Sequence, residues 1–322
     1  MTMKHEVFTN SKHICLLRRS KNLYFVIAAI LFSSFGQAQQ LPFYSQYVMN
    51  DFILNPAIAG SKKYNPVLLS FRSQWTGFND APMTQTASMH GSFGESIGAG
   101  AILFNDITGP ITRSGIQAAY AYHLKTGEFS KLSFGIGGLL YQHVLDKSAI
   151  TLDQPDDMAV LGEKERKIMA DALFGLNFTR EGLHVGLSVP QIFQTKLDFS
   201  ESENDQKMSK LVRHYFLTAG YKFQLNADFY LDPSLLVKAV TGAPPQVDVN
   251  VKVHYTELLW GGVSYRHNDA VVILLGVHKN NFLVGYSYDA TLSSIRKYST
   301  GTHEILIGLN FPKDMKKSKA SY

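Results

Sequence analysis

The stretch "QVDVNVKVHYTE", residues 246–257, alternates between apolar and polar side chains. The odd positions from Val247 to Tyr255 are apolar, and the even positions from Gln246 to Thr256 are polar. Successive side chains of an extended strand point to opposite faces of its sheet. The stretch therefore predicts a β-strand with one apolar and one polar face.

The same alternation continues on both sides of this stretch, for example in "FYLDPSLLVKAV" (229–240) and "HEILIGLNF" (303–311). It predicts about fourteen strands, many of them close to the ~10 residues that a tilted membrane-spanning strand needs. We expect these strands near residues 67–75, 83–93, 96–105, 113–125, 131–145, 169–179, 183–189, 214–225, 229–240, 246–256, 258–266, 270–279, 282–290 and 302–311.

Loop lengths distinguish a membrane barrel from a soluble β-fold, which also alternates. Every second connection is tight, as in "GES" (94–96) and "NN" (280–281). The others include the long segments 146–169, 190–213 and 290–302. Outer-membrane barrels combine short periplasmic turns with longer external loops. We therefore predict an all-β, transmembrane, up-and-down antiparallel barrel of about 14 strands, and a soluble β-fold remains the alternative.

The N-terminus has the features of a secretory signal. A basic region precedes the apolar run "LYFVIAAILFSSF" (23–35), and the small-residue site "GQA" predicts cleavage after Ala38. An uncleaved membrane anchor is the alternative. The net charge of +5 falls to +1 without residues 1–38, so the composition gives no case for nucleic-acid binding. The only cysteine, Cys15, precedes the apolar run, so we expect neither disulfides nor a lipid anchor.

These features divide the chain into four parts. We expect a signal peptide at 1–38, an N-terminal periplasmic segment at 39–65, the barrel at 66–311 and a basic periplasmic tail at 312–322. The export signal and the barrel predict a protein of the cell outer membrane, and an even strand number predicts that both termini lie in the periplasm. Apolar faces would contact outer-membrane lipids, and tyrosines near strand ends fit interface girdles, namely Tyr120, Tyr122, Tyr141, Tyr221, Tyr265, Tyr286 and Tyr288.

The opposite faces of the strands predict a polar lumen with charges of both signs. Its expected residues are Arg72, Gln117, His123, Asp171, Asn177, Lys222, Asp232, Lys238, Asp248, Lys252, His254 and Glu304. No phosphate loop, dinucleotide fingerprint, hydrolase elbow or metal-spaced cysteine motif is present. We therefore predict no enzyme, with no catalytic, cofactor-binding or metal-binding residues and no cofactor. A membrane-embedded hydrolase stays open, because spatial triads do not show in linear spacing.

The segment "YSQYVMNDFILNPAIAG" (44–60), with "FRSQW" (71–75), "APMTQTASMHGSF" (81–93) and "GLSVPQIF" (186–193), resembles the PorP/SprF family. These are outer-membrane proteins of the type IX secretion and gliding systems of Bacteroidetes. The resemblance implies a barrel that helps export or anchor a cognate type IX surface protein. It also implies a periplasmic peptidoglycan-binding lipoprotein as a partner. From the residues alone, a porin-like channel for small solutes is the alternative.

The first of these segments supplies the candidate site. Amide side chains there can hydrogen-bond backbone that has no strand partner. Two interpretations of this segment are open. It packs against or into the barrel mouth, or it forms a docking surface for a periplasmic partner. The candidates are Tyr44, Gln46, Tyr47, Asn50, Asn55, Pro56, Gly60, Arg72 and Trp75, and we expect the surface partner on the three long loops.

Overall fold

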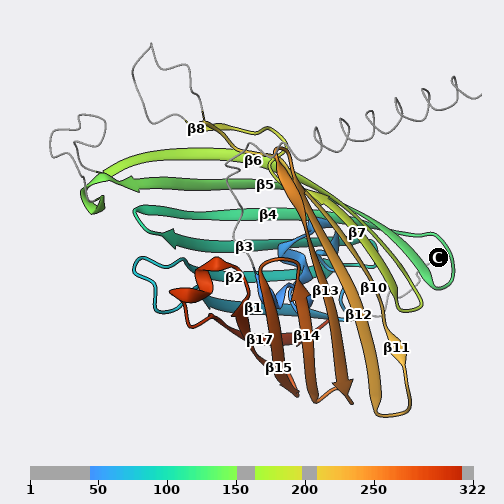
Figure 1. The fold of residues 1–322 in the computed structure, drawn as a ribbon. Helices are drawn as coiled ribbons and strands as arrows, with labels where there is room; N and C mark the ends of the chain where they lie inside the picture. The colour runs from blue at the N-terminus through green and yellow to red at the C-terminus, as the bar shows by residue number, and fades with distance from the viewer. Residues whose placement is uncertain (1–43, 151–163, 198–208, 314–322) are drawn as a thin grey trace, which may run out of the picture. The chain divides into compact units, whose positions relative to one another are not determined.

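The computed structural model describes residues 44–150, 164–197 and 209–313. One antiparallel sheet closes on itself (Figure 1). Strand β1 pairs with β2 and with β17, and β10 pairs with both β7 and β12. Strand β11 continues β10 after Lys222, so the barrel has fourteen strands. This confirms the predicted fold class.

The barrel strands run in chain order and match the predicted positions closely. They are β1 (Tyr64–Ser73), β2 (Met83–Phe93), β3 (Ile97–Thr108), β4 (Ile111–Lys125), β5 (Ser130–Asp146), β6 (Lys164–Arg180), β7 (Leu183–Val189), β10 (His214–Tyr221) with β11 (Phe223–Gln224), β12 (Phe229–Val240), β13 (Ala243–Tyr255), β14 (Leu259–Arg266), β15 (Ala270–Lys279), β16 (Phe282–Thr291) and β17 (Thr302–Pro312). Short elements outside the barrel wall are the 3-10 turns η1 (Ser45–Val48), η2 (Asp51–Ile53), η3 (Pro56–Ile58), η4 (Lys147–Ala149) and η5 (Ser294–Lys297), and the strand pair β8 (Lys196–Leu197) and β9 (Ser209–Lys210).

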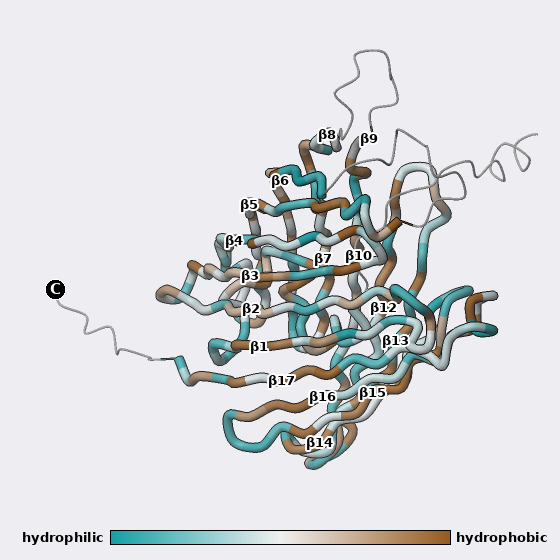
Figure 2. Tube along the Cα trace, turned by 90° about the vertical axis from the view of Figure 1, so that its left-hand side faces the viewer, coloured by the Kyte–Doolittle hydropathy of each residue, from teal (hydrophilic) through white to brown (hydrophobic). Residues whose placement is uncertain are grey.

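The wall is apolar outside and polar inside, as the alternation predicts. In β13, Val249 and Val251 are 48% and 43% exposed, whereas Asp248 and Asn250 are 3% and 1% exposed. Hydrophobic and hydrophilic residues alternate along the strands in Figure 2. Because the exposed face is apolar, it suits contact with lipid, and polar side chains fill the interior. Of the tyrosines expected in girdles, Tyr141 points inward and is 5% exposed, so that assignment was wrong for it.

The two ends of the barrel differ. The turns at one end, here called the short-turn mouth, follow β2, β4, β6, β11, β13 and β15. The other end, here called the long-loop mouth, carries the extended connections after β1, β5, β7 and β16, although the turns after β3, β12 and β14 are also short. The predicted signal at 1–38 lies outside the described residues, as do 151–163 and 198–208 of two long loops and 314–322 of the predicted tail.

Several predicted strand limits differ from the structure by two to five residues, and three of them have a local reason. Strand β6 begins at Lys164 rather than near 169, because the charged run "KERK" keeps the strand alternation and pairs with Asp146 to His143 of β5. Strand β1 ends at Ser73, since Trp75 has a positive φ of 52°. Strand β10 ends at Tyr221, where Lys222 interrupts the ladder before β11.

Candidate functional site in the barrel lumen

The lumen contains the chain's own N-terminal segment. Residues Ser45–Gly60, here called the plug, lie inside the barrel as the three 3-10 turns η1, η2 and η3 (Figure 1). Asn55 starts the last turn, its Oδ1 accepting a hydrogen bond from the Ala57 nitrogen at 2.9 Å. Pro56 follows at the first helical position, where its missing N–H costs nothing. The amide residues noted in the sequence therefore build the plug's turns.

Glycines of the barrel wall make room for the plug backbone. A Cβ atom at Gly98 would overlap the Ala59 carbonyl, and one at Gly135 would overlap the Ala57 nitrogen. A Cβ atom at Gly175 would overlap the Asn55 side chain. These glycines all face the lumen, so the wall of β3, β5 and β6 is shaped to let the plug approach closely.

Buried charges at the long-loop mouth hold the amino end of the plug. The Ser45 nitrogen donates to Glu304 Oε2 at 2.7 Å, and its hydroxyl donates to Asp289 Oδ2 at 2.7 Å. The same hydroxyl accepts from Arg72 Nη1 at 2.7 Å and from Arg266 Nη2 at 3.3 Å. Arg72 forms ion pairs with both Asp289 and Glu304 at 2.9 and 3.1 Å. Because these groups are almost fully buried, the plug's first residue completes a charge network of the wall.

The middle of the plug packs against both sides of the lumen. Phe52 is fully buried against Ile102 and Ala121 and stands edge-on to His90, with ring centroids 4.9 Å apart. Met49 packs on the opposite side against Trp260, whose side chain is 5% exposed. Complete burial of an aromatic side chain supplies a large hydrophobic contribution, so this region is a core in its own right.

The carboxy end of the plug is held at the short-turn mouth. His123 Nε2 lies 2.8 Å from the Ala59 carbonyl oxygen, and the Gly60 nitrogen donates to His90 Nδ1 at 3.1 Å. Lys313, directly after β17, donates to the Gly60 carbonyl at 3.0 Å. The plug therefore runs the length of the lumen, with its first residue at one mouth and its last at the other.

An ion pair joins the plug to the start of the barrel. Lys62 Nζ lies 2.5 Å from Asp51 Oδ2. Burial alone would raise the pKa of Asp51, but Lys62 reverses this, so the pKa of Asp51 lies below its ordinary value. Burial likewise opposes the charge of Lys62, but Asp51 raises its pKa above the ordinary value. The pair is about a third exposed, which limits its stabilisation to about 1 kcal/mol or less.

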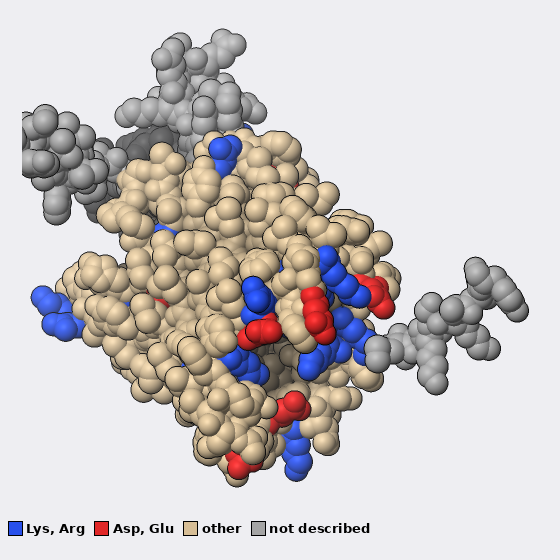
Figure 3. Space-filling model, turned by 90° about the vertical axis from the view of Figure 1, so that its right-hand side faces the viewer, with Lys and Arg blue, Asp and Glu red and all other residues tan. Residues whose placement is uncertain are grey.

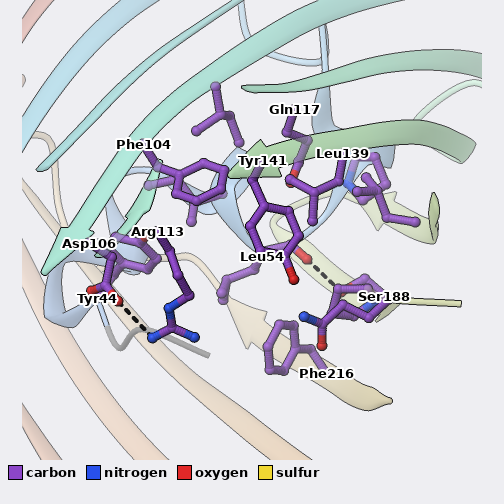
Figure 4. Close-up of a pocket in the computed structure, with 16 residues that line it drawn as sticks. Tyr44, Leu54, Phe104, Asp106, Arg113, Gln117, Leu139, Tyr141, Ser188 and Phe216 are labelled. Atoms are coloured by element: carbon purple, nitrogen blue, oxygen red, sulfur yellow. Dashed lines mark hydrogen bonds and ion pairs between the residues drawn. The ribbon is translucent and has the colours of Figure 1, made fainter. Parts of the chain in front are cut away.

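Three cavities surround the plug. One is largely apolar and lies towards the long-loop mouth, between the plug and strands β3, β5, β6 and β10 (Figure 4). The other two, here called the polar cavities because charged side chains line part of each, are open to solvent and share Asp51, Lys62, Lys222 and His254. Charged side chains gather around a hollow on the face shown in Figure 3. The polar cavities lie on the short-turn side of the plug.

The predicted site residues are mostly brought together, but inside the lumen. Those buried there are Gln46, Tyr47, Asn50, Asn55, Pro56, Gly60 and Arg72. Tyr44 lines the apolar cavity, half-buried. Trp75 is separate, in the loop after β1, where its nitrogen donates to Thr302 Oγ1 at 3.0 Å. The segment expected on the periplasmic side of the barrel therefore lies along the lumen.

Sequence reasoning missed residues on both sides of the contact between the plug and the wall. In the plug, Ser45 and Phe52 lie within the quoted segment but were not singled out. In the wall, Asp289 was not among the predicted lumen residues. The glycines offered a signal, because Gly98, Gly135 and Gly175 fall on lumen-facing positions of alternating strands. A glycine there removes the side chain that would otherwise fill the lumen.

The polar contacts of the site are made largely with the plug. Among the described residues, no group of three or more His, Cys, Asp or Glu side chains is arranged to hold a metal ion. Within the same residues, no helix has the length and apolar character to cross a membrane. The polar side chains that contact the plug mainly bond its backbone and its Ser, Asn and Gln side chains.

The fold and its plugged lumen define a membrane β-barrel of the outer-membrane type. The family model for the type IX secretion system membrane protein PorP/SprF matches residues 36–309. The chain therefore belongs to the PorP/SprF family, which confirms the resemblance seen in the sequence. No curated protein matches the chain.

Solved structures similar to the chain include the CymD monoaromatic hydrocarbon channel, at 12% identity and a TM-score of 0.45, covering 86% of this chain and 94% of that one. A Pseudomonas aeruginosa FadL homologue has 9% identity and a TM-score of 0.46, with 80% and 91% covered. The KdgM porin has 11% identity and a TM-score of 0.36, with 76% and 98% covered. Each of these structures superposes only loosely on the chain.

Proposed function

We propose that this barrel is a non-enzymatic component of the type IX secretion and gliding machinery. In this role it helps export or hold a cognate surface protein and links it to periplasmic partners. The observation that carries the proposal is the plug, which occupies the lumen from one mouth to the other. A barrel filled along its length by its own chain offers two separate faces for protein contacts rather than an open bore.

We place the barrel in the outer membrane with its short-turn mouth in the periplasm. Short periplasmic turns are typical of such barrels, and both Tyr64 and Pro312 lie at this mouth. Tyr44 lies near the opposite mouth, because the plug runs back through the lumen before β1 begins. Strand parity therefore supports a periplasmic position for Tyr64, but it does not give the position of Tyr44.

The long-loop mouth is the side that we assign to the surface partner. In the loop 290–302, Tyr298 is 69% exposed and follows the basic residues Arg296 and Lys297. An exposed aromatic residue beside cationic groups is a common element of protein interfaces. The polar cavities at the opposite mouth, with the mixed charges around them, are the corresponding place for the periplasmic lipoprotein.

Affinity purification tests this proposal. The tagged protein, isolated from gently solubilised membranes, should bring down a secreted protein with a type IX sorting domain or a peptidoglycan-binding lipoprotein. A Tyr298→Ala variant should lose the surface partner and keep the lipoprotein. Recovery of neither partner with the unaltered chain would contradict the proposal.

A porin-like channel for small solutes is the second candidate function. The two polar cavities favour it, because they leave space with charged walls beside the plug on its short-turn side. Planar-bilayer recordings separate the two candidates. The secretion role expects no sustained current from the unaltered chain and a sustained current after deletion of residues 45–60. A sustained current with the plug present would favour the channel.

A further inference from the structure

The cavity near the long-loop mouth differs from the two polar cavities, because its walls are largely apolar. It is open to solvent on one side, and apolar side chains form most of its lining. Leu54 of the plug and the preceding Tyr44 form part of its wall, and the barrel contributes Phe104, Leu139 and Phe216 (Figure 4). An apolar surface of this kind is costly to leave against water, so it points to an apolar occupant.

Two polar groups at the cavity have no partner among the described residues. Arg113 pairs with Asp106 through Nη2 at 2.7 Å, but its buried Nε has no acceptor. Gln191 is 5% exposed and lines the cavity, and its Oε1 has no donor. Ser188 is already used, since it donates to the Leu54 carbonyl at 2.6 Å. One donor and one acceptor are thus buried beside the cavity without a partner among the described residues, and burying such groups without partners costs free energy.

The position of the cavity indicates which side it serves. Asp106 and Arg113 are cross-strand partners near the turn that joins β3 to β4, at the long-loop mouth. Gln191 lies two residues after the end of β7, in one of the long loops. A molecule reaching the cavity from the long-loop mouth therefore meets its polar groups first and its apolar walls behind them.

We propose that this cavity binds one large apolar side chain of the exported partner together with its flanking peptide group. A peptide unit carries one N–H donor and one carbonyl acceptor. Its N–H would donate to Gln191 Oε1, and its carbonyl would accept from Arg113 Nε. The side chain would fill the space between Leu54, Leu139 and Phe216. This inference rests on the proposed function, because it assumes that a protein partner is held at the long-loop mouth.

Binding in this cavity should be coupled to the position of the plug. One wall of the cavity consists of plug residues, and Ser188 fixes that wall through the Leu54 carbonyl. A ligand that fits only when this wall is in place stabilises the seated plug by mass action. Occupation of the cavity should therefore slow amide exchange in the plug.

The binding test uses the purified full chain in lipid nanodiscs and a defined probe, N-acetyl-phenylalanine methylamide. Ligand-observed NMR should give a dissociation constant on the order of 1 mM, as expected for a fragment of this size. N-acetyl-serine methylamide, which keeps the peptide groups but lacks the apolar side chain, should not bind measurably.

Three variants locate the binding. Leu139→Trp fills the cavity and should abolish binding, whereas Leu140→Trp, which replaces the neighbouring lipid-facing residue, should not. Gln191→Leu removes the free acceptor and should weaken binding roughly 5- to 10-fold. This last variant keeps the test decisive if Leu139→Trp does not fold.

Two results would overturn the inference. The first is absence of probe binding. This result would leave the proposed function untouched, because partner purification tests that function without the probe. Equal binding of ethylbenzene, with no effect of Gln191→Leu, would instead assign the cavity to small apolar molecules.

Discussion

The close fit between Gly135 and the plug gives a perturbation of one methyl group. Gly135→Ala places a Cβ atom against the Ala57 nitrogen and Cα and the Pro56 carbonyl carbon. All three are backbone atoms, so no side chain can rotate away. Because ordinary contacts between heavy atoms lie near 3.5–4.0 Å, the last turn of the plug must move by on the order of 1 Å.

The cost of that movement follows from the contacts that it disturbs. The displaced turn carries the Asn55 bond to the Leu176 carbonyl at 2.8 Å and the His123 bond to Ala59 at 2.8 Å. Overpacking a well-filled interior costs about 1–3 kcal/mol. The open fraction of the plug should therefore rise roughly 5- to 150-fold, since 1.4 kcal/mol corresponds to a factor of ten. Hydrogen-exchange mass spectrometry of peptides covering 45–60 measures this change directly.

A matched control lies on the same strand. Gly138 faces outward, and a Cβ atom there meets nothing within 4 Å, so Gly138→Ala should leave exchange in the plug unchanged. Both variants should keep the heat-modifiable mobility of a folded barrel. Full protection of the plug in folded Gly135→Ala would refute the close approach of plug and wall.

Two further predictions concern the ends of the plug. Ser45→Ala removes hydrogen bonds to charged groups, so exchange at the amino end should rise by the equivalent of about 1.5–3 kcal/mol; unchanged exchange would exclude the Ser45 anchor. The pair of Asp51 and Lys62 predicts a pH dependence. The lowered pKa of Asp51 stabilises the plug above the ordinary value of 3.8, and this contribution is lost as pH falls through the lowered pKa. The raised pKa of Lys62 contributes below 10.5, and this is lost as pH rises through the raised value. In Lys62→Met, burial should raise the pKa of Asp51, so the midpoint should move to higher pH and the direction should reverse, with plug stability lost as pH rises through that raised pKa. Emission of Trp260, in a Trp75→Phe background, reports it, and an unmoved midpoint would contradict the pairing.

The barrel itself could be predicted from the sequence. Period-two alternation fixes which residues face lipid, and it extends over nearly every strand, so the number and the order of strands follow from it. The strand limits are hardest to predict where polar residues continue the alternation beyond the membrane. The charged run at Lys164 predicts a loop, but the strand continues through it, because water at the rim tolerates charges on either face of a strand.

The position of the plug could not be predicted in the same way. Ser45 contacts Asp289 and Glu304 because closure of the barrel brings β16 and β17 beside β1, and linear spacing does not contain that information. The sequence indicated turns and amide side chains at Asn50 and Asn55, which is correct locally. It did not indicate whether their partners lay inside the barrel or on another protein.

Cross-linking between Asn50 and Ser88 tests the central claim most directly, namely that residues 45–60 occupy the lumen. Asn50 Nδ2 donates to Ser88 Oγ at 2.8 Å. With Cys15 replaced by Ser, the double variant Asn50→Cys, Ser88→Cys should form an intramolecular link with a short thiol cross-linker, identified by peptide mass spectrometry. The pair Asn50→Cys, Met89→Cys should not form it, because Met89 faces outward and is 58% exposed. Absence of the first link in folded protein, or equal yields for the two pairs, would contradict a plugged barrel.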